Sequence, residues 1–160
     1  MDAQILSLIS QIAPRFGLPP ELVAAFVQTE SGGNAWASRF EPAFLDKYVG
    51  TKVATFGAVS LETERMSRAT SYGLMQVMGQ VARERGFAGS FLTQLCDPEM
   101  GLTYGCMHLA SMRDRYLNAW GWDGVIAAFN AGSPRKTGKV FVNQDYVDKI
   151  NKAWKGATHG

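Results

Sequence analysis

Apolar residues recur every three or four positions along most of the chain, and this spacing predicts a mostly helical protein. The first helical segment is defined by four such residues: Ile5, Leu8, Ile9 and Ile12. It is expected to end at residues 17–20, where glycine and proline interrupt the pattern. A second helix is predicted to begin at Pro20, which suits the first turn of a helix, and to end at the Gly32–Gly33 pair.

Glu30 lies at an apolar position of the second segment. Val23, Phe26 and Val27 occupy positions i, i+3 and i+4, and Glu30 completes the series at i+7. Burial and the negative end of the helix dipole both disfavour an ionised carboxylate there, so we expect its pKa to be raised. A protonated carboxyl near neutral pH is what general-acid cleavage of a glycosidic bond requires. The alternative is an ordinary last-turn glutamate that hydrogen-bonds to nearby amides.

Further helices are predicted downstream. Ser71 is expected to cap a helix from about Gly73 to Arg85, in which Gln76 offers an amide at the opening turn. Gly73 would permit a close backbone approach at the start of this helix. A long packing helix is expected to start after a cap at Asp97.

Two more helical segments complete the pattern. One begins at a predicted cap, Asp123, and ends at the sequence NAGSP, where Asn130 can present both a donor and an acceptor to a sugar amide. The last helix includes VNQDYVDKINKAW and carries Tyr146 beside Val147 and Ile150 toward the core. A tyrosine in this setting is usually a packing residue with its hydroxyl satisfied.

Composition limits the remaining possibilities. The chain has 160 residues, 46% of them hydrophobic, so we expect one domain over residues 1–160. Its net charge is +2 with scattered basic residues, which argues against a nucleic-acid partner. Cys96 and Cys106 are expected to be free thiols, and the two histidines, His108 and His159, suggest no metal site. The N-terminal segment predicts neither a signal peptide nor a membrane span.

Four short motifs, in order along the chain, resemble those of the soluble lytic transglycosylases. They are TES at 29–31, YGLMQVM at 72–78, AAFNAG at 127–132 and DYVDKI at 145–150. The DPEMGLTYG stretch also resembles the Asp-Pro-Glu helix of that family. The resemblance implies a single lysozyme-like helical domain, of the goose-type lysozyme and lytic transglycosylase kind. It also implies cleavage of the β-1,4 bond between N-acetylmuramic acid and N-acetylglucosamine in peptidoglycan, without a cofactor.

The resemblance also assigns the site residues. Glu30 would be the single catalytic acid and base, with Tyr146 orienting its carboxyl. The segment around the second motif would line the sugar cleft, and the third motif would complete it. The substrate-binding residues implied are Ser71, Tyr72, Gln76, Met78, Phe129 and Asn130. Phe129 stands where the family usually has tyrosine, so a hydrogen bond from that ring is lost.

A single carboxyl implies a particular mechanism. Glu30 would protonate the leaving oxygen and then deprotonate the muramoyl 6-hydroxyl, which closes to a 1,6-anhydro sugar without consuming water. The alternative is an inverting muramidase, in which a second carboxylate activates water about 6.5–9.5 Å from the acid. The candidates for that second carboxylate lie in an apparent insertion at about residues 34–70: Glu41, Asp46, Glu62 and Glu64. A cell-wall-binding or virion protein without catalysis is a further alternative.

The insertion has its own pattern. Phe40, Phe44, Leu45 and Tyr48 fit one face of a short helix, which is interpreted either as a structural flap or as a cleft wall. The sequences RFEP at 39–42 and GLMQVMGQVARERGF at 73–87 resemble phage and prophage members of the group. We therefore expect a monomeric phage endolysin that is made in the host cytoplasm and acts on the cell wall.

Overall fold

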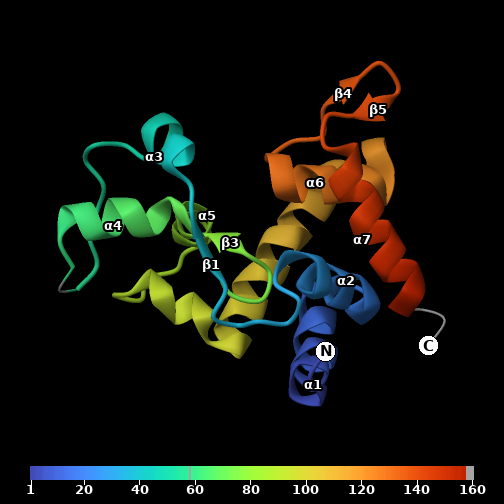
Figure 1. Cartoon of the computed structure of the whole chain (residues 1–160), viewed down its shortest axis with the longest axis horizontal. Coiled ribbons are helices and arrows are strands. Elements are labelled where there is room, and N and C mark those ends of the chain that lie inside the picture. The colour runs from blue at the N-terminus through green and yellow to red at the C-terminus, as the bar shows by residue number, and fades with distance from the viewer. Residues whose placement is uncertain (58, 158–160) are drawn as a thin grey trace. The chain divides into compact units, whose positions relative to one another are not determined.

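The computed structural model describes residues 1–57 and 59–157, and this part of the chain is mostly helical (Figure 1). It divides into two compact units. The terminal unit comprises Met1–Thr29 and the chain from Cys106 onward, and the middle unit comprises Glu30–Gly105. Helices α2 and α6 contribute to both units. The predicted mostly helical fold class is confirmed.

The terminal unit begins with α1 (Ala3–Ile12), which continues into a 3₁₀ helix (Ala13–Phe16). The Asp2 carboxylate accepts a hydrogen bond from the Gln4 N–H and caps α1. Gly17 ends the 3₁₀ helix in the left-handed conformation, with φ of 64°. The next helix, α2 (Pro20–Glu30), has the bounds that its proline and glycine residues predict.

The rest of the terminal unit comes from the C-terminal half of the chain. Helix α6 (Pro98–Ala131) is broken at Gly121, whose φ of 64° and ψ of −173° are not helical. The two helices predicted for this region are therefore present as two segments on either side of a kink. A short hairpin then joins α6 to α7 (Gln144–Ala157). Its strands are β4 (Lys136–Thr137) and β5 (Val140–Phe141). In Figure 1 this hairpin extends beyond the ends of the two helices that it connects.

The core of the terminal unit contains the apolar faces of its helices. Fully enclosed residues on α1 and α2 include Ile9, Ile12, Leu22, Val23, Phe26 and Val27. Those on α6 and α7 include Leu109, Val125, Ile126, Val147 and Ile150. The side chain of Arg113 donates to the carbonyls of Phe16 and Gly17, at 2.6 and 2.9 Å, and so fixes the turn before α2 to α6.

The middle unit has a small antiparallel sheet in the order β1–β2–β3. Its strands are β1 (Ser38–Phe40), β2 (Thr70–Tyr72) and β3 (Val77–Met78). Its helices are α3 (Pro42–Tyr48), α4 (Leu61–Arg68), α5 (Gly79–Glu84), a 3₁₀ helix (Leu92–Cys96) and the first part of α6. Asp97 caps α6 as expected, because its carboxylate accepts from the Met100 N–H at 2.9 Å.

The helix predicted from Gly73 to Arg85 is wrong in its first half. Ser71 is not a helix cap but part of β2, where it pairs with Arg39 of β1 and Met78 of β3. The helix begins only at Gly79. Pairing with β1, more than 30 residues earlier, overrides the local helical spacing, because that spacing carries no information on distant strand partners.

Gly73 is needed for a turn rather than for a helix start. Its φ is +73°, and a side chain there would collide with the carbonyl oxygen of Leu95. The close backbone approach expected from the sequence is therefore made within the middle unit, by the 3₁₀ helix that precedes α6.

Replacing Gly73 by alanine should destabilise the protein more than the same change at Gly86. Both glycines have positive φ, but within the described part of the chain nothing lies within 4 Å of a Cβ at Gly86. Gly86→Ala therefore reports backbone strain alone, whereas Gly73→Ala adds a collision with backbone. We expect the free energy of unfolding in urea to fall by about 1–3 kcal/mol more for Gly73→Ala. Equal losses would show that Leu95 yields without cost.

Candidate active site

Glu30 is the last residue of α2 and is partly buried, about one helical turn after the enclosed side chains of Phe26 and Val27. Its neighbour Ser31 anchors the end of the helix within the middle unit. The Ser31 hydroxyl donates to the carbonyl of Leu74 at 2.8 Å and accepts from the Gly33 N–H at 3.2 Å. The first motif is thereby held against the turn of the second motif, although 43 residues separate them.

The turn after β2 is built around Gln76. This residue has a positive φ of 49°, which is uncommon outside glycine. Its amide nitrogen donates to the carbonyls of Ala37 and Gly73, at 2.9 and 3.0 Å, and its amide oxygen accepts from the Ser71 hydroxyl at 3.0 Å. These bonds join the first two strands to the turn. The substrate contacts predicted for Ser71 and Gln76 stay predictions. Their structural role is to hold the turn after β2.

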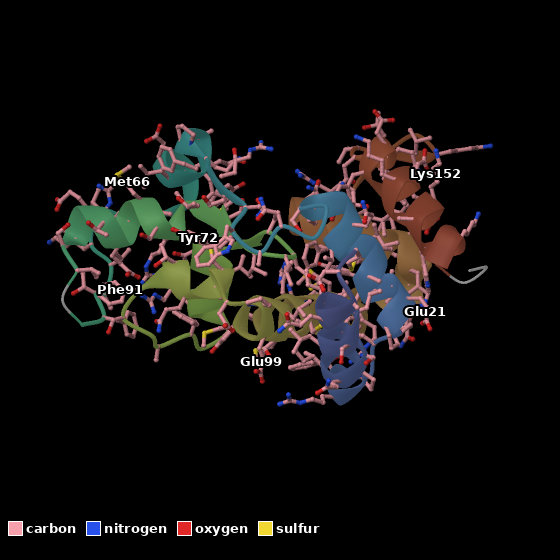
Figure 2. All side chains as sticks on the ribbon, turned by 60° about the horizontal axis from the view of Figure 1, so that its bottom comes forward. Glu21, Met66, Tyr72, Phe91, Glu99 and Lys152 are labelled. Atoms are coloured by element: carbon pink, nitrogen blue, oxygen red, sulfur yellow. The ribbon has the colours of Figure 1, made fainter. Side chains whose placement is uncertain are left out.

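Tyr72 and Met78 differ in exposure. Only 5% of Tyr72 is exposed, and its ring lies inside the middle unit, whereas Met66 and Phe91 lie at the surface (Figure 2). Burial raises the pKa of the Tyr72 hydroxyl. Met78 is partly exposed at the start of α5. Of these two predicted substrate-binding residues, Met78 has more surface to offer a ligand.

The third and fourth motifs lie in the terminal unit. The Phe129 ring is partly buried and packs against Phe26 and His108, with centroid distances of 4.7 and 4.9 Å. Asn130 is exposed at the end of α6, and Tyr146 is partly buried in the first turn of α7. The predicted role of Tyr146 as the residue that orients the acid stays a prediction.

Asn143 is a polar residue of this region that the sequence did not single out. Its side-chain nitrogen donates to the carbonyl of Ala127 at 3.1 Å and to the side-chain oxygen of Asn130 at 3.0 Å. The feature of the sequence that could have pointed to Asn143 is its position two residues before the fourth motif. That signal is weak, because an asparagine before a helix is more often a local cap.

Glu64 is unsuited to be the second carboxylate of an inverting enzyme. It is 1% exposed, and its two oxygens accept from Arg83 at 2.8 and 2.9 Å and from Arg68 at 2.8 Å. Burial by itself raises the pKa of this carboxyl, but the hydrogen bonds and charges of the two arginines outweigh it and lower the pKa overall. A carboxylate held in this way cannot reach a water on a sugar.

The remaining candidates of the insertion lie near its surface. Glu41 is paired with Arg39 at 2.6 Å, and Asp46 and Glu62 are exposed. The short helix predicted here is α3, in which the rings of Phe44 and Tyr48 pack at 4.9 Å. Phe40 lies in β1 instead.

The chemistry of the other predicted groups is limited. Cys96 and Cys106 are free and buried, as expected, and burial raises the pKa of the Cys106 thiol to about 12.

Within residues 1–57 and 59–157, no group of three or more His, Cys, Asp or Glu side chains could hold a metal ion. His159 lies outside the described residues. Within the same ranges, no helix has the length and apolar character needed to cross a membrane.

Comparisons with known proteins identify the family. The model of the transglycosylase SLT domain matches residues 7–151. A curated relative, membrane-bound lytic murein transglycosylase C of Actinobacillus pleuropneumoniae serotype 5b (strain L20), is 26% identical over 167 residues, which cover 93% of this chain and 36% of that protein. The same values hold for the proteins of that name from serotype 3 (strain JL03) and serotype 7 (strain AP76).

The chain thus spans about a third of the length of the curated relatives it matches. No solved structure matches it. The family match confirms the resemblance that four ordered motifs had indicated, and it covers most of the chain. The chain belongs to the transglycosylase SLT domain family.

Proposed function

We propose that this protein is a peptidoglycan lytic transglycosylase that cleaves the bond between N-acetylmuramic acid and N-acetylglucosamine. The family match and the names of the curated relatives support the reaction class. The observation that carries the proposal for this chain is the position of Glu30, an ionisable side chain at the end of an otherwise apolar helix face. Such a carboxyl is suited to transfer a proton to and from a sugar.

In the proposed reaction, Glu30 acts twice. Its carboxyl proton goes to the glycosidic oxygen as the bond from that oxygen to the muramoyl C1 breaks, which releases the N-acetylglucosamine 4-hydroxyl. The carboxylate then takes the proton of the muramoyl 6-hydroxyl as O6 bonds to C1. Glu30 ends in its starting state, and no water is consumed. Tyr146 is proposed to assist the acid, on the resemblance of the fourth motif.

The burial of Glu64 favours this route over hydrolysis. An inverting hydrolase needs a second carboxylate that can activate water. Glu64 is committed to two arginines and Glu41 is paired with Arg39, which leaves the exposed Asp46 and Glu62 as candidates for that role. A transglycosylase needs only the one carboxyl that the first motif provides.

The reaction products distinguish the two routes. Mass spectrometry of digested peptidoglycan should show muropeptides that are one water lighter than hydrolysed ones and that borohydride does not reduce. The closed 1,6-anhydro ring has no free reducing end, which is the reason for both properties. Reducible products of hydrolysed mass would overturn the transglycosylase proposal and leave a muramidase.

We also propose a role in phage-induced lysis, in which the protein is made in the host cytoplasm and acts on the wall. The support is the likeness of RFEP and of the stretch at 73–87 to phage and prophage members of the group. This role requires that added protein clear a suspension of cells whose outer membrane has been permeabilised. Failure to clear such cells, with cleavage of purified peptidoglycan intact, would contradict it.

A further inference from the structure

Two carboxamides in the terminal unit are joined directly. Asn143 lies between β5 and α7, and its carbonyl accepts from the N–H groups of Tyr146 and Val147, at 3.0 and 3.3 Å, so it opens α7. Its side-chain nitrogen lies 3.1 Å from the carbonyl of Ala127 and 3.0 Å from the Oδ1 of Asn130. One side chain therefore contacts α6 at two points, one of them a residue of the third motif.

The chemistry of these atoms fixes the orientation of both amides. A backbone carbonyl can only accept a hydrogen bond, so the Asn143 atom that faces Ala127 must be nitrogen. An amide nitrogen carries two hydrogens, and the second points to Asn130. The atom of Asn130 that receives it must be oxygen. The NH₂ group of Asn130 is then directed away from Asn143, on a residue that is exposed.

This orientation leaves one polar atom of Asn143 at an energetic disadvantage. Its own Oδ1 is buried and has no hydrogen-bond partner among the residues that the structure describes. Buried acceptors without partners are rare, and those that occur call for an explanation. Turning the amide over would not help, because it would place oxygen against the carbonyl of Ala127. The side chain thus keeps the orientation in which its nitrogen bonds to Ala127 and Asn130, although its oxygen is left without a bond.

We propose that Asn143 is a positioning residue that turns the Asn130 carboxamide so that its NH₂ group, rather than its oxygen, is directed to the substrate. An NH₂ donor binds an acceptor oxygen. We assign this acceptor as the carbonyl oxygen of an acetamido group on the glycan. This sharpens the expectation from sequence, in which Asn130 could present either a donor or an acceptor. The inference rests on the proposed function, because it names the group of that substrate which Asn130 binds.

A double-mutant cycle tests the connection. Asn143→Ala should raise KM for peptidoglycan strands about 2–10-fold with kcat nearly unchanged, the size expected of one oriented hydrogen bond. Asn130→Ala should raise KM to a similar extent. The double variant should show no further rise in KM over Asn130→Ala. Its melting temperature should still fall, because the bond to the Ala127 carbonyl is lost whether or not Asn130 is present.

A matched control separates positioning from general support of α7. Asn151 also joins α7 to α6, through a bond of 2.8 Å from its side-chain nitrogen to the Asp123 carboxylate. Asn151→Ala should therefore lower the melting temperature without changing KM. Two outcomes would overturn the inference. In the first, the rise in KM of the double variant equals the product of the rises in Asn143→Ala and Asn130→Ala. In the second, Asn151→Ala raises KM as much as Asn143→Ala does.

Binding measurements keep the inference separate from the reaction. In a Glu30→Gln background, Asn143→Ala and Asn130→Ala should weaken binding of strands by the same factor, measured by calorimetry without cleavage. Strands stripped of stem peptides by an amidase should show the same factor, since the acetamido groups remain. An effect confined to peptide-bearing strands would overturn the acetamido assignment. If the wild-type protein does not cleave but these binding effects appear, the proposed function fails and the positioning role stands.

Discussion

Replacing Glu30 by glutamine should lower the rate of peptidoglycan cleavage by at least about 10²–10⁴-fold, the usual contribution of a general acid and base. Glutamine has nearly the same shape but cannot give a proton to the leaving oxygen or take one from the 6-hydroxyl. The release of soluble muropeptides and the clearing of permeabilised cells measure the loss. Both should fall together.

Two controls make this result specific. Glu21 lies exposed in the first turn of the same helix, where Figure 2 labels it, so Glu21→Gln should leave cleavage unchanged. The Glu30→Gln protein should still sediment with insoluble cell walls and keep its melting temperature, because Glu30 is only partly buried. Cleavage that survives in Glu30→Gln would show that another group carries the chemistry. Loss of wall binding together with cleavage would indicate damage beyond the proton transfer.

Helices whose ends are marked by local chemistry could be predicted from the sequence. Helix α2 begins at Pro20 and ends at Glu30, before Gly32, as its proline and glycine signals indicated. Helix α6 follows the Asp97 cap, and its break at Gly121 separates the two predicted segments. In each of these cases the decisive residues lie within a few positions of the boundary they set.

The segment after Ser71 could not be predicted in the same way. Leu74, Val77 and Val81 have helical spacing, yet residues 77–78 form a strand. Their conformation is set by pairing with β2, which itself pairs with β1. These contacts depend on the distant segment 38–40 and on the turn at Gly73, which no local window contains.

The candidate site shows the same division. Glu30 stood out because a charge interrupts an apolar pattern on its own helix, and Asn130 because it lies at a predicted helix end. The partners of such side chains are less visible. Asn143 bonds to Asn130, 13 positions away, and Glu64 bonds to Arg83, 19 positions away, and polar residues at those distances have many possible partners in a sequence.

Glu64→Ala should destabilise the protein by about 3–5 kcal/mol, the usual cost of removing one partner from a buried ion pair. The variant removes the carboxylate that both arginines bind. The side chain of Arg83 is then enclosed without it, and that of Arg68, which is slightly more exposed, loses the same partner. Arg83 would keep its bonds to the carbonyls of Phe87 and Gly89 and its contacts with the rings of Phe56 and Phe87, none of which carries a full negative charge. The free energy of unfolding in urea at neutral pH measures the loss.

An exposed neighbour provides the control. Glu62 lies on the same helix, α4, so Glu62→Ala changes the same net charge without burial and should alter stability by less than about 0.5 kcal/mol. Similar losses from both substitutions would show that overall charge, rather than the enclosed pair, determines stability.

The stabilisation by Glu64 should depend on pH in one direction only. The arginines lower the pKa of this carboxyl in the folded protein below its ordinary value of 4.5. A group with a lowered folded pKa stabilises the fold fully above its unfolded pKa, and the stabilisation is lost as pH falls through the folded pKa. The difference in unfolding free energy between the wild type and Glu64→Gln should therefore be constant near neutral pH and shrink only below about 4.5, the ordinary pKa. A difference that grew on acidification would mean that burial, and not the two arginines, dominates the environment of this carboxyl.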